Sequence, residues 1–540
     1  MPHVNTEGRG ETTPPRDRRR IVAGSVIGLL SVGAALGAAE LAAGLTGSVS
    51  PVVAVGDVVV DATPAPLMEL AIALFGTADK LVLVTGIAAV LFVAGASLGV
   101  IALRCPALGY AGLAVFAAAG LAAVLLRRAD DPWAAAPVLA GAGAGVLALA
   151  LLLRSARTVH GPGRKGRPQA PADAEAAPAQ AGSGQGPGRR GFVLTATGVL
   201  VGSATAGAVG RLLPNVLGGA GARSALALPA PAEPLPALPS GVDLGVPGLT
   251  PFSTPNADFY RIDTALTIPR LDSTRWRLRV HGMVDEPFEI DMDELLALPL
   301  VEADITMTCV SNQVGGDLAG NSRWLGFPLA DLLRRAGVQS GADQILSTSD
   351  DGWTCGTPTE VVMDGRDALL AVGMGGEPLP HVNGYPARMV VPGLYGFVSA
   401  TKWVTDIKLT RFADEQAYWA QRGWAVRAPV KVMSRVDVPA PLGRVPSGDV
   451  VLAGVAWAQH RGVDAVEVRV DDGEWWEAEL AQVPGIDTWT QWVAETALDP
   501  GLHTVEVRAT DATGRTQTSE RTETVPDGAS GWHRIRFTAE

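Results

Sequence analysis

Cys309 is the residue of this chain best suited to chemistry. It lies in the segment ITMTCVSNQVGG, and the segment HVNGYPARMVVPGLYGFVSATKW begins at His381. A thiolate is the donor that a soft transition metal prefers. Backbone N–H groups, together with Arg and Lys, are the donors that bind a phosphate. The two segments therefore predict a metal–thiolate centre beside an anion-binding cradle.

The number and positions of the other cysteines limit this interpretation. The chain contains only Cys105, Cys309 and Cys355, and three cysteines cannot form a disulfide framework. Cys105 ends a long apolar run, and Cys355 in DGWTCG fits a buried structural thiol. A single cysteine is commonly a small buried hydrophobe, so the assignment of Cys309 depends on its neighbouring motifs.

Composition divides the chain into two parts. Its 540 residues have a mean hydropathy of +0.22, and 18% of them are charged. Residues 241–540 contain 25 Lys and Arg against 42 Asp and Glu, whereas residues 1–240 contain 18 against 13. We therefore expect a membrane-embedded first half and an acidic soluble second half of about two domains. The acidic balance argues against a nucleic-acid partner.

Long apolar runs predict five membrane spans, because about 20 apolar residues cross a bilayer. Four runs form a predicted four-span region at 21–155, and a fifth span is expected at 191–214. Residues 51–76 are also apolar, but acidic residues and prolines interrupt them. That segment favours a loop with an interfacial helix. None of the seven histidines falls in a span and no CxxCH motif occurs, which excludes a bis-histidine haem in the membrane.

Basic residues indicate the orientation of the spans. Arginines in the N-terminal segment 1–20 and basic residues after the fourth span place both of these ends in the cytoplasm, although Arg127 and Arg128 oppose this assignment. Residues 156–190 are rich in Gly, Pro, Ala and Gln, which indicates a disordered linker. Arg189 and Arg190 before the fifth span are compatible with an internal twin-arginine export signal and equally with a simple positively charged anchor.

The sequence pattern of the soluble half predicts an α+β region followed by a β-sandwich. Residues 215–250 are predicted to form a linker, residues 276–284 alternate as a strand, and a helix is expected to end at Gly337. Beyond residue 425 the chain shows alternating valines, as in DAVEVRV and HTVEVRA, separated by Gly/Asp turns. Such a pattern is typical of a β-sandwich.

With these motifs in order, residues 250–540 resemble the sulfite oxidase family of molybdopterin enzymes, which is related to the periplasmic methionine sulfoxide reductases. The resemblance implies a molybdopterin-binding catalytic domain at 251–424 and an immunoglobulin-like dimerisation domain at 425–540. It implies a molybdenum–molybdopterin cofactor with Cys309 as the metal ligand. It further implies cofactor contacts from Asn256, Tyr260, Thr348, His381, Asn383, Arg388, Ser399, Ala400, Thr401 and Lys402. A strand-edge role is an equal alternative for Thr348.

Departures from the family pattern leave the substrate open. No Arg follows Cys309 closely, and the family's active-site Tyr falls at Trp424. Arg261 resembles a sulfite-contacting arginine and is expected to be catalytic by orienting an anionic substrate. The chain thus fits neither the sulfite oxidases nor the sulfoxide reductases fully.

We therefore expect a membrane-anchored oxidoreductase that transfers an oxo group to or from a small substrate. In the family the cofactor is inserted in the cytoplasm, so the resemblance favours export of the folded domain to the outer face. Electrons would pass through a separate partner protein, and a homodimer is implied. A metal-free binding module on the same fold is the alternative. A transporter is disfavoured, because Glu40 is the only acidic residue inside a predicted span.

Overall fold

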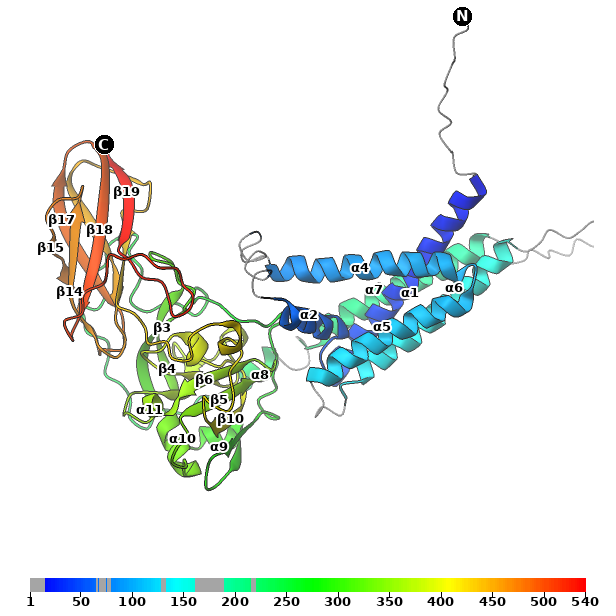
Figure 1. Ribbon diagram of the computed structural model, residues 1–540, viewed down its shortest axis with the longest axis horizontal. Coiled ribbons are helices and arrows are strands. Elements are labelled where there is room, and N and C mark those ends of the chain that lie inside the picture. The colour runs from blue at the N-terminus through cyan, green and yellow to red at the C-terminus, as the bar shows by residue number, and fades with distance from the viewer. Residues whose placement is uncertain are drawn as a thin grey trace, which may run out of the picture. The chain divides into compact units, whose positions relative to one another are not determined.

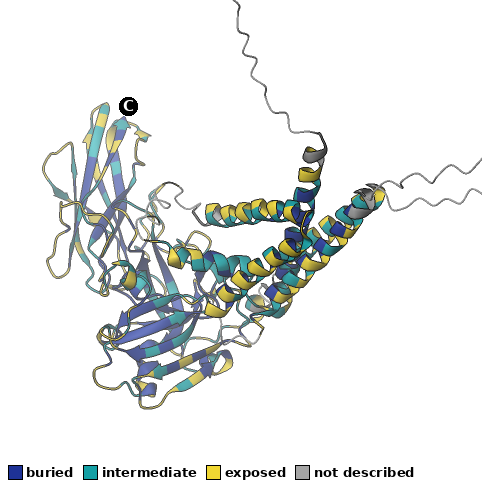
Figure 2. Ribbon diagram, turned by 45° about the vertical axis from the view of Figure 1, so that its right-hand side comes forward, coloured by how far each residue is buried: buried dark blue, intermediate teal, exposed yellow. Residues whose placement is uncertain are grey.

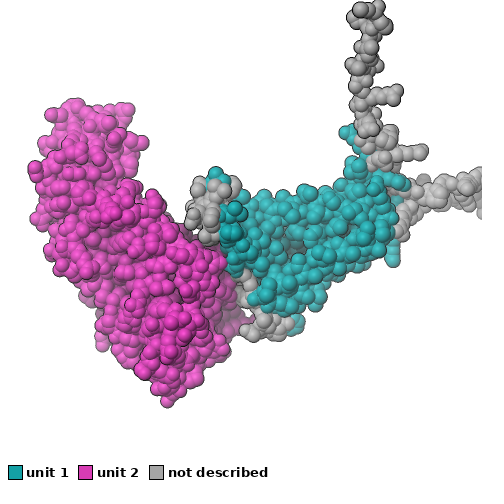
Figure 3. Space-filling view, viewed as in Figure 1, with its two compact units in different colours: residues 1–217 teal, residues 218–540 magenta. Residues whose placement is uncertain are grey.

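The computed structural model describes residues 15–64, 79–127, 133–160, 189–214 and 220–540, and the single residues 67 and 74. The chain divides into two compact units, residues 1–217 and residues 218–540 (Figure 3). Most of the predicted linker at 156–190, and part of the interrupted segment at 51–76, lie outside the described residues.

The described part of the first unit is helical (Figure 1). Five of its helices contain a stretch long and apolar enough to cross a membrane, in agreement with the expected spans. The helix α2 is the one expected in the interrupted segment. The helices are α1 (Pro15–Thr46), α2 (Pro51–Ala62), α4 (Asp79–Ala102), α5 (Pro106–Arg127), α6 (Ala136–His160) and α7 (Arg189–Pro214).

Glycines allow α1 to pack closely against its neighbours. A Cβ added at Gly28 would lie 1.9 Å from the carbonyl oxygen of Gly95 on α4. A Cβ added at Gly210 on α7 would lie 2.3 Å from the carbonyl oxygen of Glu40 on α1. Small residues at an interface allow helices to approach each other closely in an apolar environment. Residues coloured as exposed run along these helices (Figure 2), and many of the exposed residues are large and apolar.

The second unit begins with an α+β region built on two sheets. One sheet has the order β2-β1-β10-β5-β6, and the other has the order β3-β4-β7-β8 with β9 also paired to β7. The strands of the first are β1 (Arg277–Gly282), β2 (Phe288–Asp291), β5 (Gln344–Ser349), β6 (Thr354–Pro358) and β10 (Val404–Thr410). Those of the second are β3 (Val301–Thr308), β4 (Ala319–Pro328), β7 (Leu369–Met374), β8 (Glu377–Pro378) and β9 (Arg388–Val390).

Short helices connect these strands, and their ends follow from local sequence. The helix α9 starts with a capping box in which Asp291 and Glu294 each accept from the other's backbone N–H. The helix α10 ends at Gly337, whose φ of 67° is left-handed, as predicted. The helices are α8 (Ala220–Ala225), α9 (Met292–Leu296), α10 (Leu329–Ala336), α11 (Thr359–Val362), η3 (His381–Asn383), η4 (Gly396–Val398) and η5 (Ala420–Arg422).

The C-terminal part is the expected β-sandwich, with sheets in the orders β11-β13-β17-β16 and β12-β19-β18-β14-β15. The alternating residues Val466, Val468, Val505 and Val507 are fully buried in one core with Trp492. The strands are β11 (Met433–Val438), β12 (Arg444–Val445), β13 (Gly448–Trp457), β14 (Val463–Val470), β15 (Trp476–Glu477), β16 (Glu479–Leu480), β17 (Thr490–Leu498), β18 (Gly501–Asp511) and β19 (His533–Ala539).

The segment 220–250 differs from a free linker. Arg223 donates to the carbonyl oxygens of Pro378 and Leu379, and Leu226 and Leu228 pack against the buried cores. Val242 is buried in the same core and Leu238 is partly buried against it, which composition alone does not reveal. Because residues 218–540 form one compact unit, a boundary at residue 425 stays a prediction.

Candidate functional site

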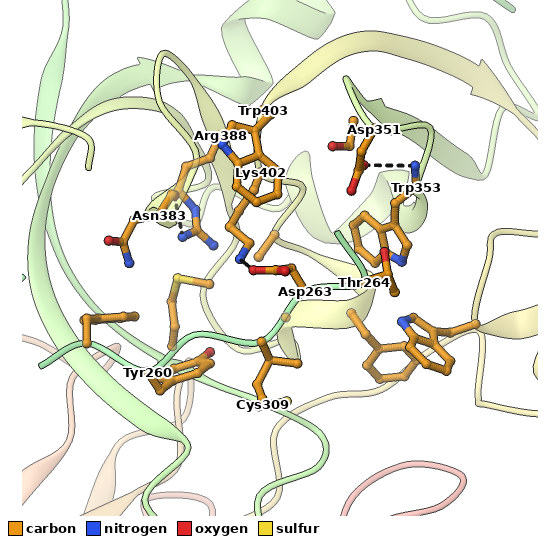
Figure 4. A pocket seen from close by; sticks show the side chains of 18 residues that line it. Tyr260, Asp263, Thr264, Cys309, Asp351, Trp353, Asn383, Arg388, Lys402 and Trp403 are labelled. Carbon is orange, nitrogen blue, oxygen red and sulfur yellow. Dashed lines mark hydrogen bonds and ion pairs between the residues drawn. The ribbon is translucent and has the colours of Figure 1, made fainter. Parts of the chain in front are cut away.

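A pocket of about 120 Å³ lies in the α+β region, where strand ends and irregular segments meet. Its lining combines Cys309 with charged and aromatic side chains (Figure 4). Of the predicted site residues, six line it: Tyr260, Cys309, Asn383, Arg388, Ala400 and Lys402. These come from four separate stretches of sequence that the two sheets bring together.

Cys309 follows the last residue of β3 and is 8% exposed. The backbone N–H of Ser311 donates to its sulfur at 3.4 Å, and its own N–H donates to the carbonyl of Leu318. Burial raises the pKa of the Cys309 thiol above its ordinary value, and the hydrogen bonds from Ser311 oppose this shift. Among the described residues no group of three or more His, Cys, Asp or Glu could hold a metal ion. A thiolate at the position of Cys309 is a donor that a soft metal prefers.

Arg388 is a buried cation on the same pocket. It begins β9, is 4% exposed, and donates to the carbonyl oxygens of Asn383 and Met389. Its guanidinium lies 5.2 Å from the centre of the Trp324 ring. Burial lowers the pKa of Arg388 to about 10, and no ion pair to a carboxylate is found for it among the described residues. A buried guanidinium in this state is suited to an anion that enters the pocket.

Lys402 is the second cation of the pocket. Its ammonium lies 2.7 Å from the carboxylate of Asp263, and burial lowers the pKa of Lys402 to about 8. Arg261 also pairs with Asp263, at 2.8 Å, but Arg261 itself does not line the pocket. The structure thus directs Arg261 toward a carboxylate rather than toward the Cys309 sulfur, which does not support its expected role with an anionic substrate.

Aromatic and acidic residues line the other side of the pocket, opposite Arg388 and Asn383 in Figure 4. Asp351 and Trp353 are labelled on this side, and Phe397 and Trp419 also line the pocket. Trp424 packs edge-on against Trp419, with ring centres 5.8 Å apart. Of these two tryptophans, which the turn at η5 separates, only Trp419 lines the pocket.

Several polar atoms of the lining have no hydrogen-bond partner in the described chain. They are the side-chain oxygens of Asn383 and Ser349 and the indole nitrogen of Trp353. Buried polar groups are almost always paired in a native protein. Their occurrence around one pocket indicates a polar ligand that offers both donors and acceptors.

The remaining predicted residues lie outside the lining. Asn256 donates to Glu377 and to the carbonyl of Met374, and Thr348 pairs with Asp406 within the β5–β10 ladder. Neither residue lines the pocket. The same is true of the other predicted residues outside the lining, which are Arg261, His381, Ser399 and Thr401.

His381, Ser399 and Thr401 make contacts in and around the loop that carries Lys402. The hydroxyl of Ser399 donates to the Leu394 and Tyr395 carbonyls, and the hydroxyls of Thr401 and Ser347 lie 2.7 Å apart. The carbonyl of His381 accepts from the Trp403 indole at 2.8 Å. These contacts hold the loop in place, although the three residues do not line the pocket.

Sequence reasoning missed Asp263, Ser349 and Asp351, which all line the pocket. Asp263 lies in a stretch with no regular secondary structure, so no periodicity marks its direction. The run STSDDGW at 347–353 was a usable signal, because a polar turn directly after a buried strand commonly reaches a site.

Residues 265–419 match the oxidoreductase molybdopterin binding domain. The uncharacterized oxidoreductase YuiH of Bacillus subtilis (strain 168) is 31% identical over 156 residues, which cover 29% of this chain and 75% of YuiH. The mitochondrial sulfite oxidase of Rattus norvegicus is 28% identical over 272 residues, covering 42% of this chain and 49% of that protein. This chain therefore spans about half the length of that relative.

Among solved structures, the sulfane dehydrogenase SoxCD from Paracoccus pantotrophus is similar with a TM-score of 0.48 and 22% sequence identity. The match covers 54% of this chain and 84% of that chain.

Proposed function

Because the chain belongs to the sulfite oxidase family of molybdopterin oxidoreductases, with molybdenum–molybdopterin as its cofactor, we propose that Cys309 is the protein ligand of the molybdenum. We further propose that the enzyme is anchored in a membrane and transfers an oxo group to or from a small substrate. The observation that carries this proposal is the buried, carboxylate-free guanidinium of Arg388 in the same pocket as the Cys309 thiol.

The residues present fit the cofactor. Arg388 and Lys402 supply two cations for its phosphate, and Arg388 can do so with fixed, planar donors. The unpaired oxygens of Asn383 and Ser349 can pair with donors of the pterin. Tyr260 lies near both Cys309 and Arg388, and burial raises its pKa, so its phenol stays protonated and can donate a hydrogen bond. The bound molybdenum supplies two-electron oxo transfer, while the chain binds, orients and excludes water.

The pocket favours an organic substrate over a small oxyanion. Arg388 and Lys402 both serve the phosphate in this proposal, Lys402 is also paired with Asp263, and Arg261 does not line the pocket, so few cationic groups remain for an anionic substrate. Trp353, Phe397 and Trp419 provide an apolar wall for a neutral organic group. A thioether–sulfoxide pair is one class that such a wall accepts. The direction of the reaction is set by the potential of the electron partner.

Assays on the purified full-length chain, expressed in a host that makes molybdopterin, test this function. Sulfoxide reduction with a reduced viologen dye is compared with sulfite oxidation by a one-electron acceptor. We expect turnover of the neutral organic compound that exceeds turnover of sulfite. Turnover of sulfite alone would contradict the substrate class, and a folded chain that takes up no molybdenum would favour the alternative of a metal-free binding module on the same fold.

We propose that the five apolar helices anchor the chain as a multi-pass membrane protein, with the molybdopterin domain outside the cytoplasm. Arg189 and Arg190 at the start of α7 support a twin-arginine type of export. A phosphatase reporter fused after Glu540 tests the orientation, since it is active only outside the cytoplasm. An inactive but expressed fusion would contradict it.

The spans carry no sign of transport chemistry. Glu40 on α1 accepts from the Ser50 hydroxyl at 2.7 Å and lies 3.7 Å from Arg211, so its charge is partnered within the helical unit. We propose a separate electron-transfer protein as the partner, and a homodimer through the β-sandwich, as the family resemblance implies.

A further inference from the structure

We propose that Gln459, from the C-terminal β-sandwich, is a positioning residue that fixes the place of Cys309. The inference rests on the proposed role of Cys309 as the metal ligand. It gives the sandwich a task in the active site of its own chain, in addition to any role in assembly.

Gln459 reaches across to the strand that ends at Cys309. It follows β13, is 1% exposed, and its side-chain nitrogen donates to the Thr306 carbonyl at 3.0 Å and to the Thr308 hydroxyl at 2.9 Å. Both acceptors lie in the last three residues of β3. The orientation of the amide is fixed, because a carbonyl oxygen such as that of Thr306 can only accept.

Holding the amide in this position leaves one of its buried polar atoms without a hydrogen bond. The side-chain oxygen of Gln459 is buried and has no hydrogen-bond partner in the described chain. An apolar side chain of similar length would leave no such unpaired acceptor. A polar residue kept in this state is better explained by what its nitrogen positions than by stability alone.

The sandwich makes two further bonds to the same strand. The N–H of Thr306 donates to the Asp487 carbonyl at 2.9 Å, and the Thr306 hydroxyl accepts from the N–H of Trp489 at 2.8 Å. The other edge of β3 pairs with β4, with Thr306 opposite Asn321. The end of β3 is therefore held from both sides, and one of those sides is the sandwich.

The loop after Cys309 is held by the sandwich as well. Arg435 on β11 donates to the carbonyl of Gly316 at 2.7 Å. His533 on β19 packs so closely on Gly315 that a Cβ there would lie 2.2 Å from its ring nitrogen. Inside the loop, Leu318 N–H donates to the side chain of Asn312. A metal ligand must be held within about 0.5 Å of its working position, and these contacts leave the loop little freedom.

The test compares two buried glutamines of the sandwich. Gln459→Met keeps the length of the side chain and removes its donor. Gln517→Met is the matched control, because Gln517 is 3% exposed and its bonds, such as those to Ser434 and Gly531, stay inside the sandwich. Thr308→Val removes the hydroxyl acceptor from the other side and serves if Gln459→Met does not fold.

Two properties are measured on the full chain. One is the alkylation rate of Cys309 in the cofactor-free protein, followed by mass spectrometry of its peptide, which does not depend on activity. The other is the paramagnetic resonance spectrum of molybdenum in the loaded protein, with Cys309→Ser alongside. We expect Gln459→Met to raise the alkylation rate at least tenfold and to alter the metal spectrum, whereas Gln517→Met leaves both as in wild type.

The outcomes separate this inference from the proposed function. If Cys309→Ser alters the spectrum but Gln459→Met and Thr308→Val change neither property, positioning by the sandwich is overturned and ligation stands. If both glutamine variants change both properties equally, the effect is general loosening and the inference also fails. If Cys309→Ser leaves the spectrum unchanged, the proposed function itself fails.

Discussion

The carboxylate of Asp263 lies 2.7 Å from the ammonium of Lys402, and their side chains are only 5% and 11% exposed. Arg261 forms two hydrogen bonds to the same carboxylate, at 2.8 and 3.1 Å, from outside the pocket. Two cations therefore share one acid, and only Lys402 faces the interior. This arrangement assigns different roles to two basic residues that the sequence placed in one site.

Arg261→Gln and Lys402→Gln should differ in effect. Arg261 is 38% exposed and does not line the pocket, so its removal is expected to lower kcat/KM by less than about threefold, or ~0.6 kcal/mol. Lys402→Gln removes a phosphate partner and should reduce retained pterin about tenfold. Steady-state kinetics and pterin fluorescence of the two variants check this. A hundredfold rise in KM for Arg261→Gln alone would restore a direct substrate role.

Arg388→Met should separate stability from cofactor binding. The variant keeps apolar packing against Trp324 but removes a buried charge that has no carboxylate partner. We expect retained pterin to fall at least tenfold, while the thermal midpoint of the cofactor-free chain is unchanged or rises, because the cost of burying the charge disappears. A large fall in that midpoint with normal pterin content would show that Arg388 is structural.

Recognisable motifs in the sequence were enough to select residues that the fold brings to one pocket, while the roles of these residues stay predictions. Cys309, Asn383, Arg388 and Lys402 lie in two such motifs, and all four line the pocket. Alternating valines were enough to predict strands such as β14, because burial on one face imposes a period of two.

Prediction from sequence does not reach a side chain whose direction depends on irregular backbone. Arg261 and Asp263 are two residues apart in a stretch without regular structure, yet only Asp263 lines the pocket. Trp419 and Trp424 are separated by the η5 turn, and the choice between them needs coordinates. The contribution of Gln459 was likewise out of reach, because 151 residues separate it from Thr308.

The packing of α7 on α1 predicts a contrast between two glycines of the same helix. A side chain at Gly210 would collide with the Glu40 backbone, whereas nothing lies within 4 Å of a Cβ at Gly202. Gly210→Val should therefore lower the thermal midpoint of the detergent-solubilised protein by several degrees, and Gly202→Val should not. Equal midpoints for the two variants would contradict the close approach of these helices.

His533 should make stability depend on acid pH. Burial, followed by the charge of Arg435, lowers the pKa of His533 to about 4, from an ordinary value of 6.5. The unfolded chain binds a proton near pH 6.5 and the folded chain only near pH 4, so the free energy of unfolding falls as pH falls through this window. The loss is on the order of 2 kcal/mol.

Denaturation of the full chain between pH 7 and pH 4 tests this. His533→Asn keeps an acceptor for the N–H of Val436, which donates to the His533 ring at 3.0 Å, and should reduce the acid sensitivity. His503→Asn is the control of opposite sign, because a hydrogen bond to the Asp499 carbonyl raises the pKa of His503. Its loss should remove stability at low pH. An unchanged pH profile in His533→Asn would be inconsistent with a neutral, buried ring.

The most direct measurement is the molybdenum content and metal spectrum of the full-length protein from a host that makes molybdopterin, with Cys309→Ser alongside. The proposed function predicts close to one molybdenum per chain in the wild type, and a spectrum in the Cys309→Ser variant that shows loss of a sulfur ligand. Because Arg388 and Lys402 are proposed to hold the phosphate, that variant is expected to keep part of its metal. A folded, exported wild type without molybdenum, or identical spectra for the two proteins, would contradict a cysteine-ligated molybdenum enzyme.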